Sequence, residues 1–416
     1  MKILLIHQAF VSPQEAGGTR HYEFARQCAT EGHSFTIVAS NLSYLTGQKT
    51  VTGKTRLVSE QDMDGVRVLR AYTYPSLHRS FVWRIVTFLS FMLTSVWAGL
   101  KAGPVDVVMG TSPPIFQAVS ASVVAFLRRR PFLLEIRDLW PEFGIDMGVL
   151  TNPVLIRLAR WLERFLYNRA AHFIVNSPAY RDYLLRKGIP QNRISLIANG
   201  VDPTMFDPTN RGEVIREEFG LVGKFVATYA GALGQANDIP TILRAAQKLQ
   251  GETAVHILLV GDGKERVNLE RLATDMDLQN VTFTGSRPKA QMKDFLAASD
   301  VGVATLLDIP MFRTTYPNKV FDYMAAGRAT VLGIDGVIRE VIEAANGGVF
   351  VPPGDADKLA EALRTLSETP ERTKAMGLAA RTYVEVHFNR HEQAQQFMAL
   401  MQSFERKGYK RLSPNL

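Results

Sequence analysis

Short apolar runs alternate with helical segments along almost the whole of this chain. Residues 2–6 and 131–136 show the pattern in the first half, and residues 225–230 and 256–260 repeat it in the second. Apolar runs of this length, separated by helical segments, are typical of parallel strands joined by crossover helices. The pattern therefore predicts an α/β protein with doubly wound, Rossmann-like parallel sheets.

The length of the chain indicates that this pattern is divided between two domains. A chain of 416 residues exceeds what one ordinary core holds. Pro203, Pro208 and Gly212 mark a linker. We predict an N-terminal domain at 1–203 and a second domain at 204–390 that faces it across a cleft. A C-terminal helix and basic tail at 391–416 are expected to cross back to the first domain.

The composition restricts the class of protein. Hydrophobic residues make up 46% of the chain and charged residues 21%, the balance of a globular enzyme. The single cysteine, Cys28, excludes a disulfide framework and a cysteine-rich zinc site, and it fits a reducing cytosol. Residues 2–6 are expected to form a strand and not a secretory signal.

The positive charge of the chain is concentrated in its first half. Residues 1–200 contain 23 Lys/Arg and 13 Asp/Glu, whereas the whole chain carries a net charge of +8. This asymmetry favours an anionic partner for the first domain. No zinc finger, RNA-recognition signature or aromatic-interleaved basic run is present, so we expect no nucleic acid partner. A phospholipid headgroup or a lipid pyrophosphate fits the charge at least as well.

The segment from Phe81 to Leu100 is long and apolar enough to span a membrane. Spanning would divide the predicted sheet between two sides of a bilayer, so two alternatives remain. The segment is either a buried core helix or a helix that lies in the membrane interface. We expect the interfacial helix, with four aromatic side chains facing lipid: Trp83, Phe88, Phe91 and Trp97.

Further along the chain, four arginines are spaced so that at least three lie along one side of a helix. A solvated helix face is the simplest interpretation of this spacing. The arginines are Arg157, Arg160, Arg164 and Arg169.

The stretch from Tyr316 to Leu332 predicts a short helix that starts at Pro317, ends at Gly327 and leads directly into a strand. Amides at a helix N-terminus bind phosphate readily. Lys319 and Asp322 lie in the first turns, where they can meet a phosphate and a ribose hydroxyl. A buried α/β helix with two surface charges is the alternative.

Candidate acceptor residues lie in two segments of the first half. Gly18 belongs to a glycine pair whose incomplete spacing makes a dinucleotide fingerprint a weak interpretation. We interpret it as a close-approach loop for an anionic acceptor, with Arg20 and His21 beside it; a plain turn and helix cap is the alternative. The charges of Arg137-Asp-Leu-Trp-Pro-Glu142 follow a predicted strand, where ligands of open α/β sheets bind. A structural salt bridge is the alternative there.

Taken together, these motifs resemble those of family-4 glycosyltransferases of the GT-B fold. The resemblance is greatest to the bacterial branch that builds O-antigen, capsule and exopolysaccharide and includes N-acetyl-L-fucosamine transferases. It spans most of the chain and rests on five segments: Arg137-Asp-Leu-Trp-Pro-Glu142, Asn199-Gly-Val-Asp202, Gly261-Asp-Gly263, Asn318-Lys-Val-Phe-Asp-Tyr-Met-Ala-Ala-Gly327 and Val351-Pro-Pro-Gly-Asp355.

The resemblance implies a nucleotide-diphosphosugar donor, here a UDP-sugar, bound on the second domain (204–390). The acceptor is then expected on the first, membrane-facing domain (1–203). The family's two glutamates, eight positions apart, fall on Thr314 and Asp322, so only the second is a carboxylate. The family's two pyrophosphate-clamping cations fall on Ala232 and Asn237, so both are missing. The expected donor-binding residues are Gly231, Gly261, Gly263, Arg287, Arg313, Lys319 and Asp322.

The resemblance also implies a retaining reaction in which the donor phosphate takes the acceptor proton. Stabilisation of the leaving diphosphate then supplies much of the catalysis. Asp138 is the expected group that orients or deprotonates the acceptor, with Glu142 as the second candidate. No D-x-D motif stands at a strand end, so no metal or other cofactor is expected. The expected acceptor-binding residues are Gly18, Arg20, His21 and Arg137.

The expected acceptor is a polyprenyl-diphosphate-linked saccharide used in bacterial surface polysaccharide synthesis. The enzyme is then expected to be peripheral, on the cytoplasmic face of the inner membrane. Two alternatives belong to other functional classes. One is a nucleotide-sugar epimerase or hydrolase on the same scaffold. The other is a non-catalytic relative that binds a membrane or a polyanion.

Overall fold

The computed structural model describes residues 1–43, 47–50, 56–75, 81–251 and 254–406. Internal contacts divide the chain into two compact units. The second unit begins a few residues before the expected boundary at residue 204, and it also includes a short loop from the N-terminal part. The first unit comprises Met1–Ser12, Thr19–Ala198 and the chain from His391, and the second comprises Pro13–Gly18 and Asn199–Arg390.

The first unit is built on one sheet of eight strands in its described part. Its strands are β1 (Lys2–Ile6), β2 (Ser34–Ser40), β3 (Val58–Met63), β4 (Val66–Ala71), β5 (Val107–Ser112), β6 (Phe132–Ile136), β7 (His172–Val175) and β8 (Ile194–Leu196). They lie in the order β3-β4-β2-β1-β5-β6-β7-β8. Neighbours are parallel except β3, which pairs antiparallel with β4 at the edge and was not expected from the sequence.

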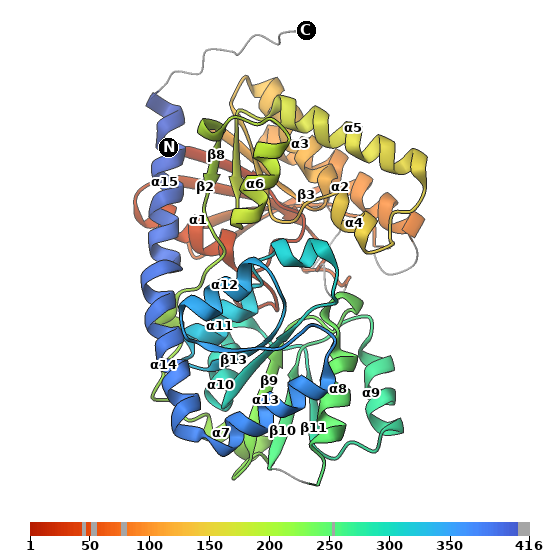
Figure 1. Ribbon diagram of the computed structural model, residues 1–416. Coiled ribbons are helices and arrows are strands. Elements are labelled where there is room, and N and C mark those ends of the chain that lie inside the picture. Colours follow the sequence, from red (N-terminus) through yellow and green to blue (C-terminus); the bar gives the residue numbers. More distant parts are fainter. Residues whose placement is uncertain (44–46, 51–55, 76–80, 252–253, 407–416) are drawn as a thin grey trace. The chain divides into compact units, whose positions relative to one another are not determined.

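Helices cover this sheet, and the last of them comes from the C-terminus of the chain (Figure 1). Phe397 of that last helix stacks on Phe24 with ring centroids 5.0 Å apart, and both side chains are buried. The expected return of the C-terminal helix to the first domain is therefore confirmed, whereas the tail residues Lys407, Lys410 and Arg411 lie outside the described residues. The helices are α1 (Arg20–Thr30), α2 (Phe81–Lys101), α3 (Ile115–Arg128), α4 (Glu142–Asp146), α5 (Pro153–Arg169), α6 (Pro178–Arg186) and α15 (Arg390–Arg406).

The second unit is built on a sheet of six parallel strands in its described part. Its strands are β9 (Phe225–Ala230), β10 (Val255–Val260), β11 (Val281–Gly285), β12 (Val301–Thr305), β13 (Ala329–Gly333) and β14 (Gly348–Phe350). They lie in the order β11-β10-β9-β12-β13-β14, so the strand order reverses between β9 and β12. In open α/β sheets, ligands bind at the carboxyl ends of the strands beside such a reversal.

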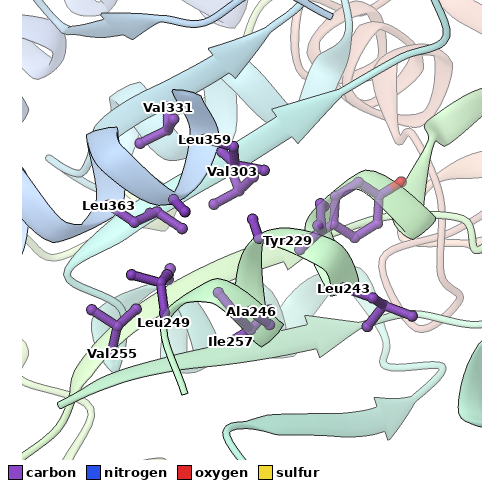
Figure 2. Close-up of a cluster of buried hydrophobic side chains, with 14 of the residues drawn as sticks. Tyr229, Leu243, Ala246, Leu249, Val255, Ile257, Val303, Val331, Leu359 and Leu363 are labelled. Carbon is purple, nitrogen blue, oxygen red and sulfur yellow. The ribbon is translucent and has the colours of Figure 1, made fainter. Parts of the chain in front are cut away.

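The helices of the second unit pack on buried apolar strands. Figure 2 shows one such core, in which Ala246 lies beside Ile257 of the sheet and Leu249 beside Val255, while Leu359 and Leu363 lie near Val303 and Val331. The helices are α7 (Glu213–Glu218), α8 (Ile239–Lys248), α9 (Arg266–Asp275), α10 (Met292–Ala297), α11 (Asn318–Ala325), α12 (Val337–Ala344), α13 (Ala356–Glu368) and α14 (Pro370–His387). The second unit also has the short 3-10 turns η2 (Pro203–Met205), η3 (Gln235–Asn237), η4 (Lys289–Gln291) and η5 (Pro310–Thr314), whereas η1 (Gln191–Arg193) belongs to the first unit.

Candidate active site

Two glycine turns lie against each other at the carboxyl ends of β9 and β10. Gly231 and Gly261 have φ angles of 157° and 154°, a region that glycine tolerates and other residues rarely adopt. A β-carbon on Gly261 would lie 1.8 Å from the carbonyl oxygen of Gly231. A β-carbon on Gly263 would lie 2.4 Å from the carbonyl oxygen of Leu233. Main chain therefore packs directly on main chain here, as expected for a surface that accepts a closely bound ligand.

Lys319 brings a positive charge to these turns from the first turn of α11. Its Nζ donates to the Tyr229 hydroxyl at 2.7 Å and to Asn237 Oδ1 at 3.0 Å. It also lies 4.0 Å from the centroid of the Tyr229 ring. A β-carbon on Gly231 would lie 3.3 Å from this ammonium nitrogen. Helix α11 thus delivers Lys319 to the glycine turn that follows β9.

The Lys319 ammonium has only neutral partners among the described residues. Burial lowers its pKa from 10.5 to about 7, and no carboxylate opposes that shift. The side chain remains partly accessible. Because burying an uncompensated charge is unfavourable, an anion that binds beside Lys319 gains more than it would at a solvated lysine.

Lys319 lies close to the two positions, Ala232 and Asn237, where the resemblance implies pyrophosphate-binding cations. Asn237, where the family resemblance implies a cation, accepts a hydrogen bond from Lys319. The carbonyl oxygen of Ala232, the other clamp position, accepts from the Tyr229 hydroxyl at 2.8 Å. The Thr314 hydroxyl, at the position of the missing glutamate, donates to the Met311 carbonyl at 2.6 Å. Lys319 is therefore the cation that the chain places where the clamp is absent.

Asp322 lies one turn further along α11 and forms an ion pair. Its Oδ2 is 2.6 Å from Nζ of Lys289, and both side chains are largely buried. The sequence predicted Asp322 as a ribose contact but missed Lys289, since the two positions are far apart in the sequence. A ribose hydroxyl would meet a carboxylate that is already held in place by this lysine.

The other two predicted donor cations have different surroundings. Arg313 is exposed and pairs with Asp308 at 3.1 Å. The Arg287 guanidinium lies over the rings of Phe219 and Phe295, 5.7 and 5.3 Å from their centroids. These contacts give Arg313 a surface ion pair and Arg287 a packing role. Of the predicted cations, Lys319 alone contacts the glycine turns through contacts that the structure describes.

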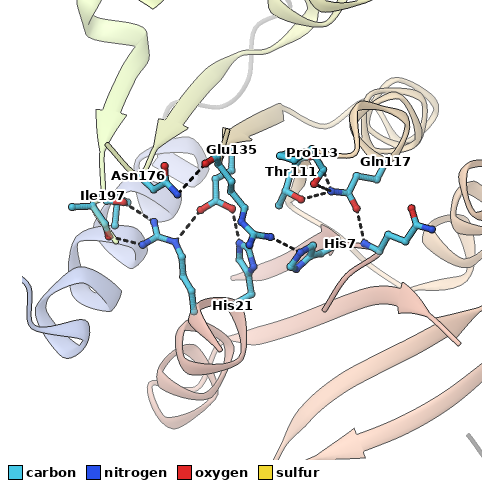
Figure 3. A network of polar contacts seen from close by, with 12 residues as sticks. His7, His21, Thr111, Pro113, Gln117, Glu135, Asn176 and Ile197 are labelled. Carbon is cyan, nitrogen blue, oxygen red and sulfur yellow. Dashed lines mark hydrogen bonds and ion pairs between the residues drawn. The ribbon is translucent and has the colours of Figure 1, made fainter. Parts of the chain in front are cut away.

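A second set of polar groups gathers at the carboxyl edge of the first unit's sheet. His7 follows β1, Arg137 and Asp138 follow β6, and Asn176 follows β7. The Arg137 guanidinium donates to His7 Nε2 at 2.6 Å (Figure 3). His7 is buried, and its Nδ1 has no hydrogen-bond partner among the residues that the structure describes. The edge therefore holds charged and polar groups from strands that are distant in the sequence.

Asp138 combines partial exposure with a perturbed acidity. Burial raises its pKa to about 6, although Arg137 and a hydrogen bond from Tyr180 act in the opposite direction. The Tyr180 hydroxyl lies 3.4 Å from Asp138 Oδ1. A carboxylate that accepts protons near neutral pH suits general-base chemistry.

Glu142 differs from Asp138 in its contacts. Both of its carboxylate oxygens accept from Arg160 of α5, at 2.9 and 2.8 Å. The structural salt bridge that was the alternative for the Arg137–Glu142 segment is therefore present for Glu142, and its partner is Arg160 and not Arg137. Asp138 is the better candidate for chemistry because Glu142 is held by a bidentate ion pair.

The expectation that Arg20 and His21 face an anionic acceptor is wrong. Both side chains are buried around Glu135, with Arg20 Nε at 3.0 Å and His21 Nε2 at 2.5 Å from its oxygens (Figure 3). Arg20 also donates to the carbonyl oxygens of Ile197 and Ala198. Burial raises the pKa of Glu135, but His21 and Arg20 outweigh that effect and hold it below its ordinary value. The cluster is a buried structural network. The sequence signal for it was Glu135, a charged residue within the otherwise apolar strand β6.

Gly18 also lies elsewhere than expected. It belongs to the loop that the internal contacts group with the second unit, and a β-carbon on it would lie 3.2 Å from the side chain of Asn318. The same loop accepts hydrogen bonds at Glu15 and Pro13 from the amides of Lys289 and Ala290. Gly18 thus adjoins the start of α11, on the side of the predicted donor residues.

Of the four aromatic side chains of α2 that were predicted to face lipid, only two are exposed. Trp83 and Trp97 are 40% and 47% exposed. Phe88 is partly buried and stacks on Phe116. Phe91 is fully buried, so its expected contact with lipid is wrong. Because α2 packs one face on the sheet and α3, only the opposite face can meet a membrane.

Among the described residues, no group of three or more His, Cys, Asp or Glu side chains is arranged to hold a metal ion. One helix of the described chain, Trp83–Lys101, is long and apolar enough to cross a membrane. Since β4 and β5 on either side of it belong to one sheet, this helix lies along that sheet.

Two α/β units with largely parallel sheets, the first of which includes the C-terminal helix, have the architecture of the GT-B fold. Residues 16–200 match the family described as glycosyl transferase 4-like domain, and residues 224–369 match glycosyl transferases group 1. These matches together cover most of the sequence. The chain therefore consists of two glycosyltransferase domains, one from each family, and is a glycosyltransferase.

Individual proteins agree with this assignment. The chain is 24% identical over 316 residues to probable glycosyltransferase WbjE of Pseudomonas aeruginosa, covering 74% of this chain and 77% of that protein. It is 28% identical over 325 residues to a GDP-mannose-dependent monoacylated alpha-(1-6)-phosphatidylinositol monomannoside mannosyltransferase of Corynebacterium glutamicum, covering 75% and 77%. The structure of Anabaena HepE in complex with UDP and glucose superposes with a TM-score of 0.73 at 19% identity, covering 97% of this chain and 100% of that one. The last likeness shows the fold alone.

Proposed function

We propose that this enzyme transfers a sugar from a UDP-sugar to a polyprenyl-diphosphate-linked saccharide during bacterial surface polysaccharide synthesis. The single observation that carries the proposal is the Lys319 ammonium, which lies beside the Gly231 turn and has only neutral partners in the described part of the chain. Two charges 4 Å apart attract by about 4 kcal/mol at an effective dielectric constant of about 20. A donor pyrophosphate beside Lys319 would supply the missing counter-charge.

The proposed reaction is retaining. The bond between the anomeric carbon of the sugar and the diphosphate oxygen breaks while the acceptor oxygen bonds to the same carbon on the same face. The leaving diphosphate gains negative charge, and Lys319 stabilises that charge. Asp138 orients the acceptor hydroxyl and holds or accepts its proton near neutral pH, as its raised pKa permits. Asp322, positioned by Lys289, accepts from a ribose hydroxyl. No metal or other cofactor takes part in the proposal.

The choice of donor draws on the structural neighbour that binds UDP and glucose. The transferred sugar is proposed as N-acetyl-L-fucosamine or another N-acetylated hexose, following the resemblance of the motifs. A GDP-mannose-dependent relative makes GDP-sugars the necessary comparison.

The lipid-linked acceptor places the proposed enzyme at the cytoplasmic face of the inner membrane, as a peripheral protein. The exposed Trp83 and Trp97 of α2 support this part of the proposal. Only 28% of the apolar window in α2 is buried, which is low for the core helix of a globular domain.

The test is transfer of radiolabelled sugar from UDP- and GDP-linked donors to lipid extracted from bacterial membranes. The expected result is an extractable glycolipid from a UDP-linked donor, with the anomeric configuration of the donor retained when followed by NMR. Donor turnover without acceptor would instead identify an epimerase or hydrolase. Absence of any glycolipid across both donor series would contradict the proposed acceptor class.

A further inference from the structure

Helix α5 presents an apolar face to the outside of the first unit. Leu158 and Trp161 are 55% and 63% exposed, and Phe165 is 41% exposed. These positions repeat every three to four residues and so lie along one side of the helix. The buried side chains Glu163 and Tyr167 lie about half a turn away. A surface helix of a globular protein ordinarily has the reverse arrangement, with its apolar face inward.

Helix α5 packs beside α3, and α3 packs beside α2 (Figure 1). The Arg169 guanidinium of α5 lies 5.0 Å from the centroid of the Phe126 ring of α3. Arg128 of α3 donates to the carbonyl oxygens of Gly99 and Gly103, at and just after the end of α2. We call the exposed apolar side chains of these three helices the outer apolar surface: Trp83, Leu89, Leu93, Trp97, Leu100, Val123, Phe126, Leu127, Val154, Leu155, Leu158, Trp161 and Phe165.

Positive charge surrounds this surface. Arg157 and Arg164 are exposed on α5, and Arg129 and Arg130 are exposed at the end of α3. Helices α2 and α3 contain no carboxylate, and the one carboxylate of α5, Glu163, is buried. An apolar face bordered by arginines, without exposed acids on the same helices, matches an interface of acyl chains and anionic headgroups.

We infer that the outer apolar surface is where this protein docks on an anionic lipid bilayer, with α5 contributing as much as α2. A symmetric contact between two copies would place the arginines of α5 against arginines of the same kind, which is unfavourable. A bilayer instead offers both the apolar interior and the negative charge. The inference rests on the proposed function, because docking would give the enzyme access to a lipid-linked acceptor. It assigns a role to the face of α5 that the arginine pattern alone suggested was solvated.

The experiment is flotation of the full-length protein with two kinds of vesicle, one of phosphatidylethanolamine and phosphatidylglycerol and one of phosphatidylcholine alone. The expected result is binding to the anionic vesicles that weakens with added salt. Leu158→Ser with Trp161→Ser should reduce the partition coefficient at least about tenfold. Arg157→Gln and Arg164→Gln should each reduce it about fivefold on anionic vesicles only.

Matched controls distinguish this surface from general hydrophobicity. Val214→Ser and Val267→Ser remove exposed apolar side chains from the second unit, 76% and 74% exposed, and should leave vesicle binding unchanged. Binding of UDP, followed by thermal shift, should be the same in all variants, so that loss of the donor site is separable from loss of docking. The same shift reports whether each variant is folded.

Three results would overturn the inference. One is absence of binding to anionic vesicles by the wild type. Another is equal loss of binding in the α5 variants and the controls. The third is a stable dimer in sedimentation analysis that Trp161→Ser converts to monomer without any change in vesicle binding, because the surface would then be an interface between copies.

Discussion

At the scale of single residues, Lys319 determines how the proposed donor site responds to pH. Burial lowers its pKa to about 7, so the side chain is largely neutral above that pH when the site is empty. A bound diphosphate favours the charged form and raises the pKa again. Binding above about pH 7 must therefore take up a proton.

This coupling gives a measurable prediction. Calorimetric titration with UDP in buffers of different ionisation heats should detect uptake of about one proton above pH 7 and little uptake below it. The affinity should fall as the pH rises above about 7. Lys319→Met should remove both the uptake and the slope. A wild-type affinity that stays constant across this range would contradict the role of Lys319.

The sign for stability is opposite to that for binding. Between about pH 7 and 10.5 the unfolded chain keeps Lys319 protonated while the folded, empty protein does not. The unfolded state then binds more protons, so the contribution of this residue to stability rises with pH in that window. Urea unfolding of the empty protein should show a component of this sign, absent in Lys319→Met.

Asp138 predicts the acid limb of the activity profile. Its pKa is raised to about 6, so the carboxylate needed for proton acceptance is lost as the pH falls through that value. Asp138→Asn should lower kcat by about 100-fold or more with little change in UDP affinity. Glu142→Gln, which removes the carboxylate paired with Arg160, is the matched control and should have a much smaller effect. Near-normal turnover by Asp138→Asn would exclude it as the acceptor base.

Some of these residues were predictable from the sequence and others were not. Lys319, Asp322, Gly231 and Gly261 lie beside strand ends, where local pattern and topology place them. The pairing of Arg20 with Glu135 joins positions 115 residues apart, so no local signal separates a buried ion pair from an acceptor site. Conversely, the missing clamp was visible in the sequence, but the reach of Lys319 to Asn237 required the fold.

At the scale of elements, the two glycine turns after β9 and β10 form the backbone surface of the proposed donor site. Gly261→Ala would place a β-carbon 1.8 Å from the Gly231 carbonyl oxygen and force one turn to move. We expect loss of UDP binding together with a destabilisation of about 1–3 kcal/mol from backbone strain. Gly354→Ala, at a φ of 78° with open space around it, is a control for strain without a clash. Equal UDP affinity in both variants would argue against the turns as the ligand surface.

At this scale the sequence predicts that a segment is helical but not which face of the helix is buried. The sequence predicted a core or an interfacial helix for α2 and a solvated arginine face for α5. The pattern could not say which face of either helix packs on the rest of the unit. Phe91 was expected at the surface and is buried, whereas Trp161 is exposed. The direction of a helix face depends on its neighbours, here α3 for both helices, and those contacts are not local in the sequence.

At the scale of the whole molecule, the last helix belongs to the first unit. Phe397 of α15 is buried against Phe24, so the first unit requires the C-terminus of the chain for its core. Phe397→Ala should lower the free energy of unfolding of the first unit by about 3–5 kcal/mol. Hydrogen exchange of β1 amides should report this loss, while Leu185→Ala, at a partly exposed site of the same unit, should change it little. Unchanged protection of β1 in Phe397→Ala would contradict this account of the core.

The central claim is that a nucleoside diphosphate binds beside Lys319 on the second unit. The most direct test is calorimetric measurement of UDP binding to the wild type, to Lys319→Met and to the control Lys293→Met, which removes an exposed lysine of α10. Loss of a charge-assisted hydrogen bond predicts about 10- to 100-fold weaker binding for Lys319→Met. The Lys293→Met control should bind like the wild type. Equal affinity of all three proteins for UDP would contradict the account.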